Sequence, residues 1–290
     1  MGGIVWRQNK QKTKSGGDVM RNILRAVLER FPVTMQFLRN SRDMLDQHAP
    51  AKKTVWGFTL AGHDAMAAGT FEPEETAWVR KLLLEVDIMV NVGANVGYYC
   101  CHALSMGKPV IAVEPIARNL HYLLTNIRNN GWSQQAEVFP VALSAAPDIL
   151  QMWGGGTGAS LVKGWASIPE SYVTHVPILT LDRVTGDSIK GKRTLILVDV
   201  EGAELMMLHG ATQTLKNDIK PIWVMEITNP ANQPAGTIVN SNFTKIFEMF
   251  FEHGYRVVTA DSKEQEITQR DIDEVMAGTK QLEAHNFIFR

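Results

Sequence analysis

The sequence predicts a doubly wound α/β fold, with a mostly parallel seven-stranded sheet that ends in an antiparallel C-terminal hairpin. Three observations carry this prediction. Short apolar runs alternate with amphipathic segments from about residue 76 onward. A glycine turn, Asn91–Tyr99, directly follows one apolar run and opens a helical segment. The next apolar run ends on an acid, Glu114. Alternating strands and helices are typical of a parallel sheet covered by helices.

Five apolar runs predict the parallel strands, and the segments between them predict helices. The strands are expected at 87–92, 109–114, 136–142, 194–199 and 221–227. The helices are expected near 76–85, 97–106, 116–130, 202–216 and 241–252. Two closing runs, Tyr255–Val258 and His285–Phe289, predict the hairpin. The stretch 148–178 interrupts the alternation.

The chain is expected to divide into an N-terminal extension, residues 1–65, and a sheet domain, residues 66–290. Residues 1–17 are polar and basic, which predicts disorder. Asp18 is positioned to cap a helix whose apolar stripe runs from Met20 to Leu28. We expect this helical extension to pack on the sheet domain or on a second subunit, which would give a homodimer. A membrane-surface helix is the less favoured alternative, because the stripe is modest.

Composition excludes several classes of protein. A formal net charge of −1 over 290 residues argues against a general nucleic-acid binder. The two cysteines, Cys100 and Cys101, are adjacent on a predicted helix, so we expect small core residues rather than a disulfide or zinc site. This usage suits the reducing cytoplasm. No run of about 18 apolar residues predicts a transmembrane helix.

The glycine turn and the acid after it predict a nucleoside site. Gly93 and Gly97 have a spacing that fits neither the dinucleotide fingerprint nor the P-loop. Such a turn lies at the carboxyl edge of a strand, where ligands bind, and glycine lets the backbone approach them. Glu114 is positioned to accept hydrogen bonds from both hydroxyls of a ribose. A ribose acceptor without a phosphate clamp indicates S-adenosylmethionine (SAM) rather than NAD or ATP.

The chain resembles the FkbM family of SAM-dependent methyltransferases over about residues 66–290. The motifs that carry the resemblance are Phe71-Glu72-Pro73, the VGANVGYY turn, Val113-Glu114-Pro115, Val141-Ala142-Leu143-Ser144, Leu179-Thr180-Leu181-Asp182, Val198-Asp199-Val200-Glu201-Gly202-Ala203-Glu204 and Met225-Glu226-Ile227. This implies a Rossmann-like class I methyltransferase fold, SAM as cofactor, S-adenosylhomocysteine (SAH) as product, and hydroxyl acceptors. The family pattern usually has Asp where this chain has Asn91, which keeps the size and one acceptor but loses the charge.

The residues expected to bind the cofactor come from these motifs. They are Phe71, Glu72, Asn91, Gly93, Ala94, Asn95, Gly97, Glu114, Pro115, Ala142 and Asp199. Ala142 has the small size that lets an adenine ring lie flat, and core packing is its alternative. Phe71 and Glu72 are expected to fold over the methionine end, with a surface turn at Pro73 as the alternative.

Methyl transfer to a hydroxyl needs a base during the reaction, and Asp199 is the leading candidate. It ends a predicted buried strand, so its carboxylate is expected at the ligand edge. Capping of the following helix is the alternative role. Glu201, in the same turn, is a second catalytic candidate. Glu204 falls in the first helical turn, where a carboxylate favours the helix dipole, so a structural role is as well supported.

The acceptor is expected to contact residues of the interrupting stretch and of the next strand end. The candidates are Trp153, Gly156, Thr157, Trp165 and Glu226. The glycine run there lacks the lysine of a phosphate loop, so a lid or an acceptor-binding loop fits better. Core packing is the alternative for both tryptophans. Asp199, Glu226 and Asn229 are also oxygen ligands that a divalent metal such as Mg²⁺ accepts, but the metal-free interpretation is favoured.

The sequence therefore predicts a SAM-dependent O-methyltransferase that acts on a hydroxyl of a small molecule or glycan. Three rivals stay open. The acceptor atom could differ, as in N-methylation. An NAD(P)-dependent oxidoreductase is opposed by the glycine spacing. A binding protein without catalysis is kept open by Asn91.

Overall fold

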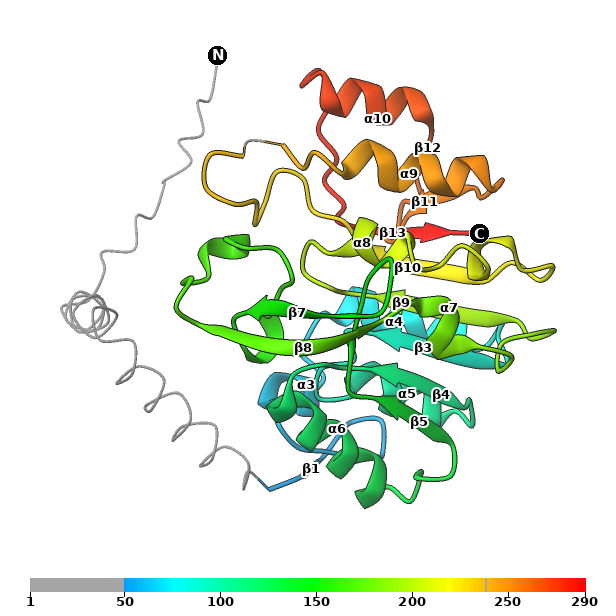
Figure 1. Cartoon of the computed structure of the whole chain (residues 1–290). Coiled ribbons are helices and arrows are strands. Elements are labelled where there is room, and N and C mark those ends of the chain that lie inside the picture. Colours follow the sequence, from blue (N-terminus) through cyan, green and yellow to red (C-terminus); the bar gives the residue numbers. More distant parts are fainter. Residues whose placement is uncertain (1–49, 238) are drawn as a thin grey trace, which may run out of the picture. The chain divides into compact units, whose positions relative to one another are not determined.

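The computed structural model describes residues 50–237 and 239–290, and it has the expected α/β fold (Figure 1). The strands are β1 (Lys52–Lys53), β2 (Thr59–Leu60), β3 (Ile88–Val92), β4 (Val110–Val113), β5 (Ala136–Phe139), β6 (Ala142–Leu143), β7 (Asp148–Trp153), β8 (Val173–Leu179), β9 (Thr194–Val198), β10 (Ile222–Glu226), β11 (Val257–Thr259), β12 (Glu266–Ile267) and β13 (Asn286–Phe289). The α-helices are α3 (Asp64–Ala68), α4 (Pro73–Leu83), α5 (Tyr98–Ser105), α6 (Ala117–Asn129), α7 (Leu181–Thr185), α8 (Glu204–Leu208), α9 (Phe243–Glu252) and α10 (Gln269–Met276). Short 3₁₀ turns occupy Gly156–Gly158, Trp165–Ser167 and Thr214–Lys216.

The main sheet has the strand order β12-β11-β13-β10-β9-β3-β4-β5. The five strands from β10 to β5 are parallel, and β13, β11 and β12 continue the sheet in antiparallel pairs. The chain order reverses at β3, which has β4 on one side and β9 on the other. The carboxyl ends of β3 and β9 are in register, since Val92 pairs with Val198. Ligands of open α/β sheets bind at such a reversal.

Helices cover both faces of this sheet, and the alternating strand side chains explain why. Val90, Val92 and Ile196 point to one face and pack with residues of α7, α8 and α9. Met89 and Leu195 point to the other face and pack with residues of α4, α5 and α6. All residues of β3, β4 and β9 are buried, as expected for central parallel strands. Cys100 and Cys101 are buried and free, as the sequence predicts for core residues.

Two smaller groups of residues pack around the main sheet. Phe58, Leu60 and Met66, from β2, α3 and the adjoining turns, share a hydrophobic cluster with Tyr98 and Tyr122. The insertion between β5 and β9 forms a three-stranded sheet of order β6-β8-β7. In it, β7 pairs antiparallel with β8 and β6 pairs parallel with β8. The glycine run lies in the connection between β7 and β8.

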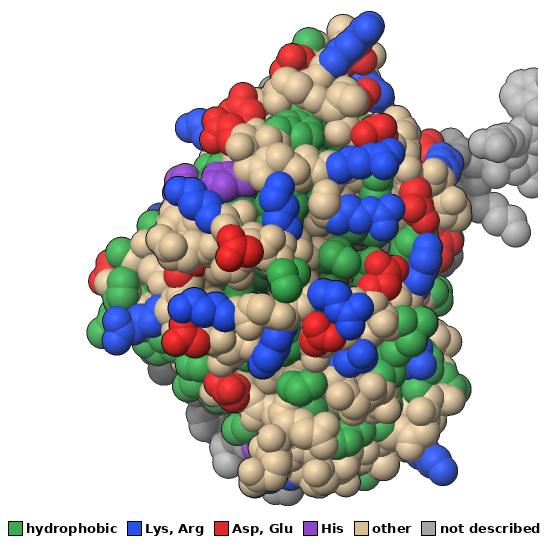
Figure 2. Space-filling view, turned by 90° about the vertical axis from the view of Figure 1, so that its right-hand side faces the viewer, with side chains coloured by type: hydrophobic (Ala, Val, Ile, Leu, Met, Phe, Trp, Pro, Cys, Tyr) green, Lys and Arg blue, Asp and Glu red, His purple; other side chains and the backbone are tan. Residues whose placement is uncertain are grey.

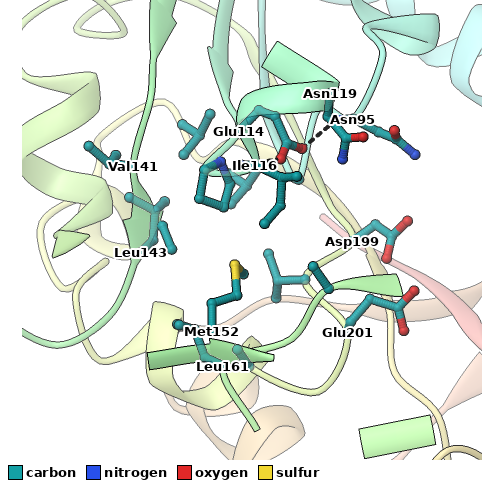
Figure 3. A pocket seen from close by; sticks show the side chains of 18 of the residues that line it. Asn95, Glu114, Ile116, Asn119, Val141, Leu143, Met152, Leu161, Asp199 and Glu201 are labelled. Carbon is teal, nitrogen blue, oxygen red and sulfur yellow. Dashed lines mark hydrogen bonds between the residues drawn. The ribbon is translucent and has the colours of Figure 1, made fainter. Parts of the chain in front are cut away.

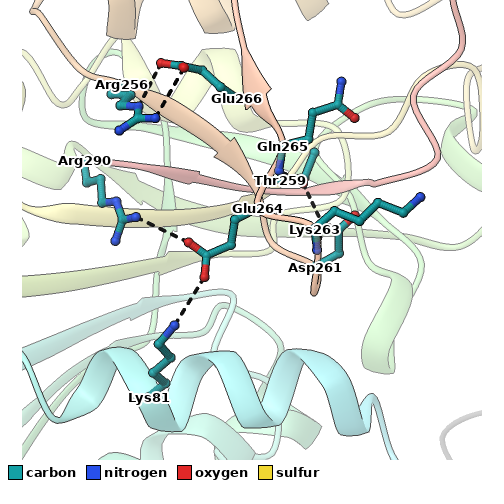
Figure 4. Close-up of polar contacts among 9 residues, drawn as sticks. All are labelled: Lys81, Arg256, Thr259, Asp261, Lys263, Glu264, Gln265, Glu266 and Arg290. Atoms are coloured by element: carbon teal, nitrogen blue, oxygen red, sulfur yellow. Dashed lines mark hydrogen bonds and ion pairs between the residues drawn. The ribbon is translucent and has the colours of Figure 1, made fainter.

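Ion pairs on the surface hold the C-terminal edge of the sheet (Figure 4). Arg256 donates to Glu266 at 2.8 Å and joins β11 to β12. Glu264 lies between Lys81, at 3.3 Å, and Arg290, at 3.5 Å. Exposed pairs of this kind stabilise a fold by less than about 1 kcal/mol each. They position the edge strand more than they stabilise it.

The structure differs from the sequence-based prediction in three elements. The strand expected at 136–142 ends at Phe139, and Ala142 belongs to β6 of the three-stranded sheet. The main sheet has an eighth strand, because the two residues of β12 add to β11, and so short a strand leaves no sequence pattern. The helix expected over 202–216 is broken into α8 and a 3₁₀ turn. Gly210 lies where a Cβ would come within 2.2 Å of the Ser144 carbonyl oxygen, and Asp182 accepts from the Gln213 and Thr214 amides at 2.8 and 2.9 Å. The predicted N-terminal helix at 20–28 lies outside the described residues.

The charges on the surface and the lengths of the helices agree with what the composition predicts. Figure 2 shows basic and acidic side chains interspersed over one face, which gives it a mixed charge. No helix in residues 50–237 or 239–290 is long and apolar enough to cross a membrane.

Candidate active site

A cavity of about 570 Å³ lies at the carboxyl ends of β3, β4 and β9, where the strand order reverses. Figure 3 shows its three sides. Val141, Leu143, Met152 and Leu161 form an apolar side, Asn95, Glu114 and Asn119 form a polar side, and Asp199 and Glu201 form an acidic side. A concave site lined by apolar side chains and a few convergent polar groups is typical of small-molecule sites.

The glycine turn after β3 brings the backbone close to the end of β9. Gly93 has φ +83°, and a Cβ there would lie 1.8 Å from the carbonyl oxygen of Asp199. The Gly93 amide donates to the Val113 carbonyl at 3.0 Å, and the Asp199 amide donates to the Val92 carbonyl at 3.0 Å. Only glycine fits this position, because any side chain would collide with backbone. The turn therefore packs directly against the backbone at the end of β9.

Glu114 ends β4 and is held by donors from the turn. One carboxylate oxygen accepts from the Asn95 amide at 2.8 Å, and the other accepts from the Ile116 amide at 2.7 Å. Burial nevertheless raises the pKa of Glu114 to about 7, while these donors and the Asn119 side chain act to lower it. The carboxyl is therefore fixed in orientation with remaining acceptor capacity toward the cavity.

The acidic side brings together carboxyls from three parts of the chain, which are α4, the loop after β9 and the end of β10. Burial, then the neighbouring Glu226 and Glu201, raise the pKa of Asp199 well above its usual range. Burial and repulsion also raise the pKa of Glu226 and of Glu75 to about 7. The Asp199 side chain is exposed to the cavity although it lies deep among these groups. Such a set of raised carboxyl pKa values is typical of functional sites and favours a cationic ligand.

The loop between β9 and α8 fixes the acidic side. Glu201 has φ +52° and accepts from the Trp165 indole nitrogen at 2.7 Å. Glu204 is buried in the first turn of α8 and accepts from the Gly202 amide at 2.8 Å. A small cavity beside the first is lined by Trp165, Asp199, Glu201, Glu204, Glu226 and Thr228. Within the described residues, no group of three or more His, Cys, Asp or Glu side chains has an arrangement that could hold a metal ion.

The structure brings most of the sequence-predicted site residues to this place. Those that line the main cavity are Gly93, Asn95, Glu114, Pro115, Ala142, Gly156, Thr157, Asp199 and Glu201. Trp165 and Glu226 line the adjoining small cavity. The nine residues of the main cavity thus come from the ends of β3, β4 and β9, from β6 and from the connection between β7 and β8.

Six other predicted residues lie outside the wall of the main cavity. Asn91 is buried in β3, and its amide donates to the Cys100 sulfur at 3.4 Å. Ala94 packs in the core, and a Cβ on Gly97 would meet the Leu123 side chain at 2.5 Å. The remaining three are placed as follows: Trp153 pairs with Ser160, Phe71 packs edge-on against Tyr98, and Glu72 accepts from the Tyr99 hydroxyl at 3.2 Å.

The cavity also contains residues that the sequence did not indicate. Ile116, Asn119, Val141, Leu143, Met152 and Leu161 all line it. Val141 and Leu143 belong to the motif Val141-Ala142-Leu143-Ser144, but the direction of their side chains depends on how β6 pairs with β8. Met152 and Leu161 come from the insertion, which gave no clear periodicity. Asn119 lies five residues after Glu114, in the first turn of α6, and this spacing alone does not predict a site residue.

Comparisons with known proteins give a family and several solved structures. Residues 91–257 match the family model described as "Methyltransferase FkbM domain". A methyltransferase FkbM from Methylobacillus flagellatus KT is 17% identical, with a TM-score of 0.41, over 70% of this chain and 43% of that chain. The O-methyltransferase from Bacillus cereus in complex with SAH is 11% identical, with a TM-score of 0.39, over 75% and 80% of the two chains.

A third structure is the precorrin-6y C5,15-methyltransferase from Geobacter metallireducens GS-15. It is 14% identical, with a TM-score of 0.35, over 74% of this chain and 85% of that chain. No curated protein matches the chain. The chain spans less than half the length of the Methylobacillus protein.

Proposed function

Because this chain belongs to the FkbM family of methyltransferases, we propose that it transfers a methyl group from SAM to a hydroxyl of a small molecule or glycan. The observation that carries the proposal is the arrangement of the cavity. A fixed acid at the end of β4 lies between an apolar side and an acidic side, all at the reversal of strand order. The fixed acid matches the ribose of SAM, the apolar side matches the adenine, and the acidic side matches the cationic methionine end.

The residues of the cavity fit SAM on three counts. Gly93 lines the cavity at a position where a Cβ would collide with the Asp199 backbone, so a ligand meets backbone there without a side chain. Glu114 keeps acceptor capacity for ribose hydroxyls, and no lysine or arginine lines the cavity among the described residues. Asp199 is positioned to oppose the positive charge of the sulfonium, and its neighbouring carboxyls are positioned to oppose that of the ammonium group. SAM, when bound, supplies an electrophilic methyl group on a sulfonium.

Asp199 acts as the base in this proposal. With SAM bound, Asp199 would accept the proton of the acceptor hydroxyl while the hydroxyl oxygen displaces sulfur from the methyl carbon. The carbon–sulfur bond would break with its electrons left on sulfur, so the products would be a methyl ether and SAH. Burial makes this carboxylate a stronger base than in water, because its pKa is raised. The positive charge of the sulfonium favours the ionised form of Asp199, so Asp199 is ready to accept a proton only when SAM is bound. Glu201, anchored by Trp165, adds negative charge beside it.

The experiment uses SAM with a deuterated methyl group, incubated with the protein and with extracts or candidate alcohols, sugars and amines. Mass spectrometry then finds any product that carries the label. We expect a labelled methyl ether, and a labelled amine would instead assign the acceptor to nitrogen. Complete absence of labelled product, together with no binding of SAH, would contradict the proposal.

Asp199→Asn then tests the role of the base with the acceptor so found. We expect turnover to fall by about 100-fold, the usual scale for a lost general base, while SAH binding changes little. Asp187→Asn is the matched control, because the Asp187 side chain is 86% exposed and forms a surface ion pair with Lys190. Near-parental turnover in Asp199→Asn would return this residue to a structural role.

A further inference from the structure

Asn119 has a buried acceptor that no protein group satisfies. Its side chain is 2% exposed, it lines the main cavity, and its Oδ1 has no hydrogen-bond partner. Its Nδ2 donates to the Gly156 carbonyl at 2.9 Å. A carbonyl can only accept, so this contact identifies which end of the amide is nitrogen. The oxygen must therefore be the end without a partner.

A buried acceptor without a partner is costly, and it indicates that a ligand completes the site. Leaving one unsatisfied weakens a fold by roughly 1–3 kcal/mol. Asn119 lies in the polar side of the cavity beside Glu114, whose orientation is set by the Asn95 and Ile116 amides (Figure 3). The missing partner must be a donor that sits next to this carboxyl.

We infer that Asn119 Oδ1 accepts a hydrogen bond from a ribose hydroxyl of the cofactor, and that Asn119 thereby links the cofactor to the connection between β7 and β8. This inference rests on the proposed function, because it takes the ligand of the cavity to be an adenosyl compound. A ribose hydroxyl has one proton to donate and is the donor that Glu114 would bring to this place. Asn119 is then a second determinant of the ribose, and a phosphate there would meet an acceptor instead of a donor.

The other end of the amide makes the link to the insertion. Gly156 belongs to the 3₁₀ turn Gly156–Gly158, and both Gly156 and Thr157 line the cavity. The two ends of this connection are also joined by a backbone hydrogen bond, in which the Gly154 amide donates to the Tyr172 carbonyl at 2.8 Å. An amide whose oxygen is held by the ribose has its nitrogen fixed toward Gly156. Cofactor binding should therefore order the connection between β7 and β8 before the acceptor binds.

Calorimetry on the full chain with SAH and with SAH analogues that lack the 2′- or the 3′-hydroxyl tests the first part. In the parent, each missing hydroxyl weakens binding. In Asn119→Leu, we expect SAH to bind roughly tenfold more weakly, the scale of one lost buried hydrogen bond. The penalty for removing one of the two hydroxyls should shrink by the same factor. Asn129→Leu is the matched control, because Asn129 is exposed on the same helix.

Hydrogen exchange with mass spectrometry tests the link. SAH should slow exchange at residues 154–158 in the parent but not in Asn119→Leu. Asn119→Asp gives an independent test should the leucine variant fail to fold, because it keeps an acceptor for the hydroxyl and loses the donor to Gly156. It should keep the dependence on the hydroxyl and lose the protection of residues 154–158.

The outcomes separate this inference from the proposed function. Equal hydroxyl penalties in the parent and in Asn119→Leu would overturn the inference while SAH binding stands, and would leave water as the partner of Oδ1. Absence of SAH binding in the parent would instead remove the proposed function, and the inference with it.

Discussion

The affinity for adenosine should rise about tenfold between pH 6 and pH 8. Burial raises the pKa of the Glu114 carboxyl to about 7 in the ligand-free cavity. Ribose hydroxyls donate to the ionised carboxylate and favour it, so the ligand lowers this pKa. At pH 6 about one tenth of the carboxyl is ionised, and at pH 8 about nine tenths, which gives the tenfold ratio or about 1.4 kcal/mol. Affinity is thus lost as the pH falls through about 7.

Adenosine is the right ligand because it has the ribose and the adenine but no amino-acid group to oppose the acidic side. Titration calorimetry in two buffers of different ionisation enthalpy should find about half a proton released on binding at pH 7. The control is Glu114→Gln, which cannot ionise. In this variant one of the Asn95 and Ile116 amides would face an amide nitrogen, so we expect weaker binding without the pH dependence.

Two results would refute this reasoning. One is an adenosine affinity that stays constant between pH 6 and pH 8 in the parent. The other is a pH dependence of equal size in Glu114→Gln, which would assign the proton to another carboxyl.

Two further predictions concern stability without ligand. The protein should melt at a lower temperature at pH 8 than at pH 5.5, because Glu75, Glu114 and Glu226 keep their protons in the folded state up to a pKa of about 7, against 4.5 in the unfolded chain. Equal melting temperatures by calorimetry would contradict it. Gly93→Ala should lower stability by about 2 kcal/mol or more, because its Cβ would meet the Asp199 carbonyl oxygen. Denaturant unfolding measures this, and an unchanged midpoint would show that the turn can shift.

The sequence was sufficient for the sheet domain because its central strands are buried on both faces. Apolar runs such as Leu195–Val198 leave a strong signal, and the five parallel strands of the main sheet lie within the predicted ranges. Elements that are short or exposed leave no such signal in the sequence. In the strand β7, Asp148–Trp153, the exposed face includes the apolar Ile149, so apolar and polar residues do not alternate along it. The pairing of β12 depends on β11 rather than on its own two residues.

Some residues of the candidate site could be predicted from the sequence, and others could not. Glu114 and Asp199 could be predicted, because an acid that ends a buried strand must lie at the ligand edge of the sheet. Asn119 could not, because its role depends on the approach of Gly156 from a distant segment. Asn91 also needed the structure, since its side chain contacts Cys100 within the core and does not line the cavity.

A crystal structure of the protein with SAH tests the central claim most directly. We expect SAH in the main cavity, with its ribose on Glu114, its adenine against Leu143 and Met152, and its sulfur directed toward Asp199. This placement would put the transferred methyl group of SAM beside the proposed base. A cavity that holds no SAH at saturating concentration, or SAH with its sulfur on the apolar side away from Asp199, would contradict the account.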